Sequence, residues 1–180
     1  MERLGAKEMN SMVTRRLFWI SWCGATALTG LMAGFLTSHS IMFGRFQTWF
    51  IESGNADLLR QTFSVFRAAS SPHILYDSFL YVALIAGVVW TVFAFLLKRD
   101  RVIAVVAGLS TFWVGAVFFG FDFGKVEDQV MMGIADESTM ATFAHLNVPL
   151  HTGFAVFYVI SLFLLLSVAL RQLGVWRKTG

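Results

Sequence analysis

Two pairs of polar residues with helical spacing are the first candidates for chemistry in this sequence. His73 and Asp77 are four residues apart, and so are Asn147 and His151; residues at this spacing lie on the same face of a helix. A histidine and a carboxylate so placed can supply two ligands to one metal ion, or the carboxylate can orient a histidine that acts as a general base. The alternative is structural: each pair is a buried polar contact that tethers neighbouring segments.

The segment HLNVPLH, residues 145–151, gathers polar groups directly before a long apolar run. Proline inside a helix clashes with the carbonyl four residues earlier, so Pro149 should bend or start a helix near His145. On a straight helix His145 does not share a face with His151, because six residues turn the chain by about 240°. We interpret the segment as a kinked helix entry that aims both histidines and Asn147 into one space. The simpler alternative is that Asn147 caps the helix and His145 faces water.

Two more polar residues stand at the ends of apolar runs, His39 after the first and Asp122 after the third. The predicted metal ligands are His39, His73, Asp77 and His151. The predicted catalytic residues are His73, Asp77 and His151. Asn147, His145 and Asp122 are expected to be further ligands or to contact the cofactor. Histidine and carboxylate without thiolate suit a transition metal, iron or copper above all, with zinc possible by ligand type. No haem motif is present, and haem stays open as an alternative.

The composition indicates which class of protein must position these residues. Hydrophobic residues make up 57% of the 180 residues and charged residues only 14%, with a mean hydropathy of +0.67. Soluble domains are typically about 45–50% apolar and about 25% charged. The chain is therefore expected to lie in a membrane. Its one cysteine, Cys23, excludes a disulfide within the chain.

Four runs are long and apolar enough to cross a bilayer, which takes about 20 residues of helix. They lie at about 17–38, 74–97, 102–121 and 150–170. Because lipid offers no hydrogen-bond partner to exposed backbone, we expect helices. The predicted fold is a single all-α membrane domain over 1–180, a four-helix bundle with a lid formed by 39–73 and 122–149.

Signals for helix starts are present in both lid segments. Asn55 should cap an amphipathic helix that follows it, and Ser71 with Pro72 should start the second span. Ser138 is the expected cap of a short helix that runs through Phe143. The segment 41–53 either prolongs the first helix or lies in the membrane interface.

The charges predict the orientation of the bundle. The termini and the 98–101 turn hold ten of the 14 Lys and Arg, whereas the lid side holds all four histidines and eight of the 11 Asp and Glu. Cytoplasmic loops carry the basic excess in membrane proteins. We therefore expect cytoplasmic termini and an extracytoplasmic lid, which in a bacterium would face the periplasm from the inner membrane. The net charge of +3 is then a topology signal, and no nucleic-acid partner is expected.

Two motifs, GLMAGFLTSHSIMFGR at 30–45 and HLNVPLHTGFAVF at 145–157, resemble the small four-helix membrane proteins of the anthrone oxygenase-like family. In that family the last helix opens with an Asn-x-Pro-Leu-Asn type sequence. Here Asn147, Pro149 and Leu150 match it, and His151 stands where the family usually has asparagine. The resemblance implies oxygenation of hydrophobic, often polycyclic, substrates, sometimes without a cofactor. The histidine at 151 and the additional histidines favour a metal.

The leading hypothesis is thus a membrane oxidoreductase, a metal-dependent oxygenase whose hydrophobic substrate arrives from the bilayer. Without a metal, the His73–Asp77 pair could act as a general base on an acidic C–H and leave a carbanion that reacts with O2. The alternatives are an accessory or structural subunit of a larger membrane complex, and a metal-, haem- or quinone-binding module without catalysis. A homo-oligomer is compatible with each of these.

Overall fold

The computed structural model describes residues 2–173, without the side chains of residues 2–11, 72 and 73. Within that range every element is helical, which confirms the predicted all-α class. In chain order the elements are α1 (Glu2–Ser38), the π-helical turn η1 (His39–Phe43), α2 (Gly44–Glu52), α3 (Ala56–Ser70), α4 (Pro72–Leu96), α5 (Arg101–Ile103), the π-helical turn η2 (Ala104–Gly108), α6 (Ser110–Gly120), α7 (Phe123–Met131) and α8 (Glu137–Gln172).

Three helical segments are long and apolar enough to cross a membrane: Met12–Glu52, Ile74–Leu96 and Glu137–Gln172. A fourth crossing results if Arg101–Gly108 and Ser110–Gly120, which are bent by 44° at their junction, count as one span. These lengths and compositions support a multi-pass membrane protein. The predicted third span at 102–121 is therefore found as two helical pieces with a break between them, and it crosses the membrane only if both pieces form one span.

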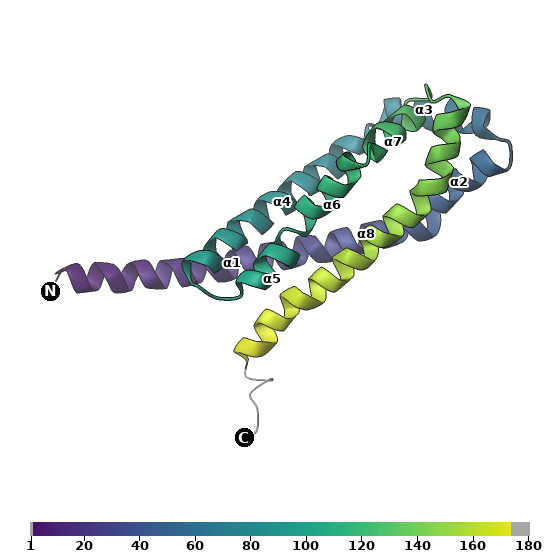
Figure 1. Ribbon diagram of the computed structural model, residues 1–180. Coiled ribbons are helices and arrows are strands. Elements are labelled where there is room, and N and C mark those ends of the chain that lie inside the picture. Colours follow the sequence, from purple (N-terminus) through teal and green to yellow (C-terminus); the bar gives the residue numbers. More distant parts are fainter. Residues whose placement is uncertain (1, 174–180) are drawn as a thin grey trace, which may run out of the picture.

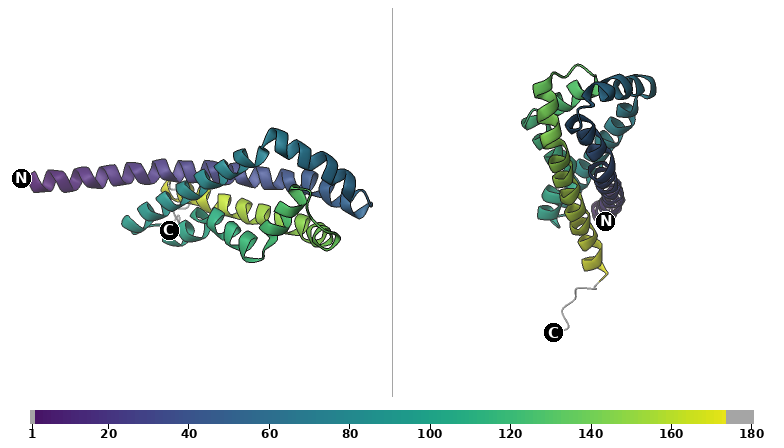
Figure 2. Two further views of the ribbon diagram at one scale, coloured as in Figure 1. Left: turned by 90° about the horizontal axis from the view of Figure 1, so that it is seen from above. Right: turned by 90° about the vertical axis from the view of Figure 1, so that its right-hand side faces the viewer.

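The helices form one elongated bundle in which α1 and α8 are the longest members (Figure 1). The N-terminal part of α1 projects beyond the other helices, and α2, α3 and α7 lie at the opposite end (Figure 2). Apolar side chains form three successive core clusters along the bundle. They centre on Phe18 and Trp90, on Phe154 and Tyr158, and on Phe123 at the α3–α7 end.

The first span does not end at residue 38, as the apolar run suggested. It continues through η1 into α2 and ends at Glu52, so the segment 41–53 prolongs the first helix up to that residue. Nothing in this stretch forbids a helix: it contains no proline, and Gly44 has ordinary right-handed helical dihedrals. The extra residue in the π-helical turn keeps the backbone hydrogen-bonded, because the Gly44 N–H donates to the His39 carbonyl.

Close contact with α4 accompanies the break in the third span. A Cβ atom on Gly87 would lie 1.9 Å from the Gly108 carbonyl oxygen, so only glycine permits this approach of the two backbones. Two side chains hydrogen-bond carbonyls in the bent region: Thr91 Oγ1 donates to the Ala104 carbonyl at 3.0 Å, and Trp113 Nε1 donates to the Val105 carbonyl at 2.8 Å.

The last helix begins well before the predicted start at 150. Asp136, rather than Ser138, is its N-cap, because the Asp136 carboxylate accepts from the Thr139 N–H at 2.7 Å. The helix then continues through Pro149, and Figure 1 shows that α8 changes direction in its first half. Proline costs one backbone hydrogen bond there, but neighbouring helices often compensate for this in membrane helices.

Helices α3 and α4 begin where the sequence predicted, but the predicted side-chain caps are not formed. Asn55 immediately precedes α3, yet its amide donates to Ser53 instead of capping the helix. Pro72 opens α4 as predicted, and Ser71 before it adopts a left-handed conformation, φ +44°, without a side-chain cap.

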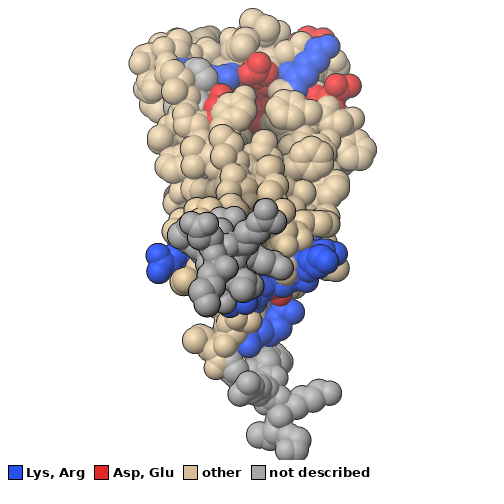
Figure 3. All heavy atoms as spheres, turned by 90° about the vertical axis from the view of Figure 1, so that its left-hand side faces the viewer, with Lys and Arg blue, Asp and Glu red and all other residues tan. Residues whose placement is uncertain are grey.

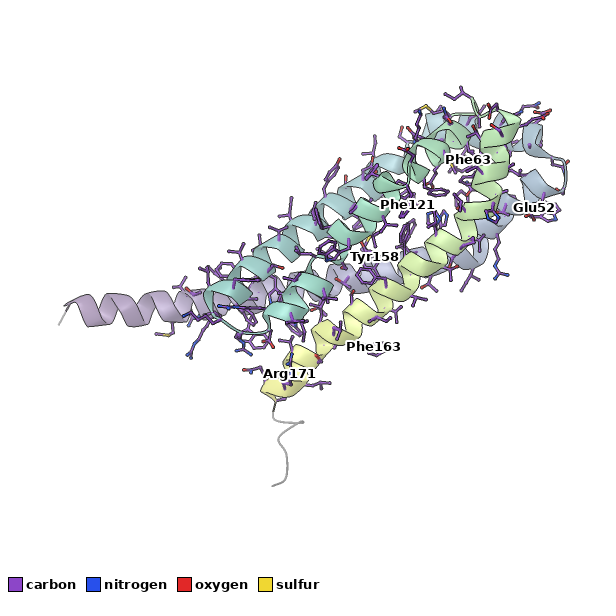
Figure 4. All side chains as sticks on the ribbon, viewed as in Figure 1. Glu52, Phe63, Phe121, Tyr158, Phe163 and Arg171 are labelled. Carbon is purple, nitrogen blue, oxygen red and sulfur yellow. The ribbon has the colours of Figure 1, made fainter. Side chains whose placement is uncertain are left out.

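Charged side chains are confined to the two ends of the bundle. Figure 3 shows a continuous band of uncharged surface between a predominantly basic end and an end of mixed sign. At the basic end Arg171 pairs with Asp100 at 2.9 Å, and the Arg99 guanidinium lies 5.0 Å from the Phe18 ring. Figure 4 shows Arg171 and Glu52 at opposite ends. The side chains of Arg3 and Lys7, and residues Arg177 and Lys178, lie outside the described part of the chain.

Candidate functional site

Two histidines from the first and last spans meet inside the bundle. The ring centroids of His39 and His151 are 4.0 Å apart and the ring planes are inclined by 31°. Both residues are buried, with 8% and 6% of their surface exposed. The sequence predicted each of these histidines as a ligand, and the structure brings them into contact.

The π-helical turn positions His39. It adds one residue to a helical turn, so His39 and Ser40 face the interior together with Gly44 and Gln47 in the next two turns. Gly44 lies directly beneath the imidazole: a Cβ atom there would be 3.2 Å from His39 Cδ2 and 3.3 Å from His39 Nε2. The small residue is therefore what allows the ring to lie flat against the helix.

Helix α8 positions the other half of the site. Asn147 and His151 share one face of this helix, as their spacing predicted, and both are buried. Asn147 Nδ2 donates to the Gly44 carbonyl at 3.0 Å and lies 3.5 Å from Thr48 Oγ1. One amide thus connects the last span to the residue that supports His39, and its side chain also interacts with the His39 ring.

The hydrogen bond of His151 defines its tautomer. His151 Nδ1 lies 2.8 Å from the Asn147 backbone carbonyl, which can only accept, so Nδ1 must carry the proton. In a neutral imidazole the other nitrogen then presents a lone pair. His151 Nε2 is therefore available as a base or as a ligand.

Three buried polar atoms at the site lack a hydrogen bond of good geometry within the described residues: His39 Nε2, Gln47 Oε1 and Asn147 Oδ1. Buried polar groups are normally paired, and the Asn147 and His39 side chains interact with each other here, so Gln47 Oε1 is the one of these three atoms for which the described residues offer no partner. The surroundings are aromatic. Phe43, Phe123 and Phe154 pack edge-on against the two imidazoles, with ring centroids 5.4–6.1 Å away.

The other predicted residues do not join this cluster. Asp77, Asp122 and His145 are exposed, whereas the cluster is buried. His145 turns away because α8 stays helical through Pro149, so the six-residue separation from His151 keeps the two on different faces. Asp122 lies in the left-handed turn before α7, with φ +54°. The side chain of His73 lies outside the described residues.

The fit of a metal ion can be judged from the donor atoms. Among the described residues, no group of three or more His, Cys, Asp or Glu is placed to hold a metal ion. The cluster offers two imidazoles and the amide oxygens of Gln47 and Asn147. Iron sites that activate O2 combine histidine with carboxylate, and this cluster has no described carboxylate. The donor set of the described residues therefore does not match the predicted His/Asp metal site.

Gln47 and Gly44 were not predicted as site residues. Both fall in a segment that the sequence left open as either helix or interface, and nothing in the residue pattern marks the extra residue of a π-helical turn. The available signal was weak: Gln47 is one of three polar residues, with Arg45 and Thr48, in the largely apolar stretch IMFGRFQTWFI.

Comparison of the chain with family models, with curated proteins and with solved structures gives no match. The resemblance to anthrone oxygenase-like proteins thus stays a hypothesis.

Proposed function

We propose that this chain is an integral membrane oxidoreductase that oxygenates a hydrophobic substrate, with His39 and His151 as its acid–base centre. The observation that carries the proposal is the contact between these imidazoles, 4.0 Å apart and buried between two membrane-spanning segments. Ionisable groups at such positions are costly and are therefore functional candidates by default. The resemblance of residues 145–157 to the anthrone oxygenase-like motif points to the same reaction class.

The chemistry requires one base, and His151 Nε2 supplies it. This nitrogen takes one proton from an acidic CH2 group of the substrate, and the carbanion adds to O2 to form a peroxide anion. The peroxide takes up a proton from the imidazolium, and loss of water then leaves a carbonyl group on the substrate. The backbone carbonyl of Asn147 keeps His151 in the required tautomer throughout.

The proposed orientation places this centre at the extracytoplasmic end of the bundle, facing the periplasm if the protein lies in a bacterial inner membrane. It is supported by the basic residues around Arg99 and Arg171 at the opposite end. A substrate that dissolves in the bilayer can reach the site without crossing the aqueous phase.

The test is O2 uptake by the protein in lipid nanodiscs with anthrone and a panel of smaller aromatic compounds that carry an acidic C–H. His151→Gln should lower the rate by at least about 100-fold, the usual contribution of a general base. His145→Gln is the matched control, because it changes an exposed histidine on the same helix. Equal rates for wild type and His151→Gln with every compound would contradict the proposal.

Metal analysis of the same preparations addresses the predicted iron or copper. Metal that copurifies with wild type and is absent from the His39→Gln/His151→Gln double variant would show that the pair holds an ion. Metal-free protein with O2 uptake supports the acid–base centre. Protein without uptake that copurifies with fixed partners supports an accessory subunit.

A further inference from the structure

A pocket between α2 and α3 is separate from the two imidazoles but adjoins them. It has a volume of about 180 Å³ and is lined almost entirely by apolar side chains, among them Phe46, Leu59 and Phe63. Phe43 also lines it, and the same ring packs against His39 at a centroid distance of 5.4 Å. One layer of side chains therefore separates the pocket from the histidine pair.

Gln47 and Thr62 are the polar residues of this lining, and of the two only Gln47 is buried. Its side chain is completely buried, and Oε1 lacks a hydrogen-bond partner among the described residues. Its Nε2 has only a weak acceptor, the Met131 sulfur at 3.5 Å. A buried amide without full pairing costs free energy, so a ligand group that pairs with it binds at an advantage.

The dimensions and the lining define the ligand. An apolar cavity of about 150 Å³ holds one benzene ring, so this pocket suits a single aromatic ring better than a polycyclic compound. A hydroxyl group both donates and accepts, and it can therefore pair with either end of the Gln47 amide. Edge-to-face contacts with the surrounding phenylalanines favour an aromatic ring.

The pocket is also reachable from the bilayer. Phe46 and Phe66, which line it, are both exposed on the outer surface of the helices. Phe46 belongs to the membrane-spanning segment Met12–Glu52. A small apolar molecule can thus enter sideways from lipid. Figure 4 shows Phe63 at the end of the bundle that contains α3.

We infer that this pocket binds a small, single-ring phenol from the bilayer, with the phenol hydroxyl paired to Gln47. This binding does not depend on the proposed function, because the layer of side chains that includes Phe43 separates the pocket from the histidine pair.

Saturation-transfer NMR on the protein in nanodiscs tests the inference, with para-cresol and toluene as probes and empty nanodiscs as the reference. Wild type should bind para-cresol more tightly than toluene. Gln47→Leu should raise the dissociation constant for para-cresol roughly tenfold, the loss expected for one hydrogen bond, and leave toluene unchanged. Gln61→Leu, at an exposed glutamine of α3 outside the pocket, is the matched control.

A second variant keeps the inference testable if Gln47→Leu does not fold. Thr62 lies at the exposed rim of the pocket, so Thr62→Phe should obstruct it and weaken binding of both probes. Para-cresol binding that survives both substitutions, or that equals the signal of empty nanodiscs, overturns the inference. His151→Gln should retain para-cresol binding while it loses O2 uptake, so failure of the pocket and failure of the proposed function are told apart.

Discussion

At the scale of single residues, Gly44 controls how closely His39 can approach the rest of the site. A methyl group at this position would lie 3.1 Å from the His39 carbonyl oxygen and 3.2 Å from its ring. The contact is tight but not prohibitive, so a substitution should move the imidazole rather than unfold the protein.

We predict different effects for alanine substitutions at two glycines of the first span. A methyl group on Gly34 would meet no atom within 4 Å beyond its own stretch of helix, so Gly34→Ala should stabilise the helix by about 0.5–1 kcal/mol. Gly44→Ala should lack this gain and should shift the NMR signals of the His39 ring. Thermal unfolding in detergent and nitrogen-15 histidine spectra measure both effects. Unchanged histidine signals in Gly44→Ala would show that the ring does not rest on this residue.

Glu127 on α7, outside the membrane-spanning segments, makes stability depend on pH. Burial raises its pKa from 4.5 to about 7, with a further contribution from the charge of Asp128; Arg67 acts in the opposite direction. Between pH 4.5 and about pH 7, Glu127 therefore keeps its proton in the folded protein but has lost it in the unfolded chain. The contribution of Glu127 to the free energy of unfolding should be fully present below about pH 4.5. It should be lost as the pH rises towards and through 7.

Glu127→Gln should remove that dependence, because glutamine keeps the shape of the protonated acid without a titratable proton. We expect the variant to exceed wild type at pH 8 by on the order of 1–3 kcal/mol and to match it near pH 5. Glu52→Gln, at an exposed glutamate, is the control and should follow wild type. If the free energy of unfolding of Glu127→Gln changed with pH in the same way as that of wild type between pH 5 and 8, the prediction would be wrong.

At the scale of elements, the broken third span depends on its fit to α4. The carbonyl of Gly108 occupies the place where any side chain on Gly87 would begin. Gly87→Ala should therefore separate the two backbones and destabilise the protein by about 3 kcal/mol or more, since neither partner is a flexible side chain. Gly115→Ala, in α6 of the same span and with open space around it, should be tolerated. Equal yields and melting temperatures of the two variants would show that the contact is loose.

The helices could be predicted from the sequence because their causes are local. Apolar runs longer than about 18 residues and the Ser71–Pro72 start signal can be recognised directly in the sequence. The continuation to Glu52 and the early start of α8 could not be predicted with the same rules, since both occur in stretches of moderate polarity where packing against other helices decides.

The site could be predicted only in part for a related reason. The spacing of Asn147 and His151 correctly placed them on one helical face, and the position of His39 at a span end suggested a shared location. Asp77 was chosen for its helical spacing to His73 and Asp122 for its place at the end of an apolar run, but the exposure of a side chain depends on which helical face meets a neighbour. The π-helical turn that rotates Gln47 inward has no signature in the sequence.

At the scale of the whole molecule, the separation of charge between the two ends predicts the orientation. In a Cys23→Ser background, a membrane-impermeant maleimide added to intact cells should label Ser53→Cys, in the exposed turn between α2 and α3. It should label Lys98→Cys, in the turn after α4, only after lysis. The reverse pattern would invert the topology and place the histidine pair at the cytoplasmic end.

The central claim is that His39 and His151, more than one hundred positions apart in the chain, touch inside the membrane. Solid-state NMR of histidine-labelled protein in lipid bilayers tests it most directly. A cross-peak between two imidazole rings should appear, and it should disappear in His39→Gln and in His151→Gln but persist in His145→Gln. Well-resolved histidine signals without any ring-to-ring cross-peak would contradict the account.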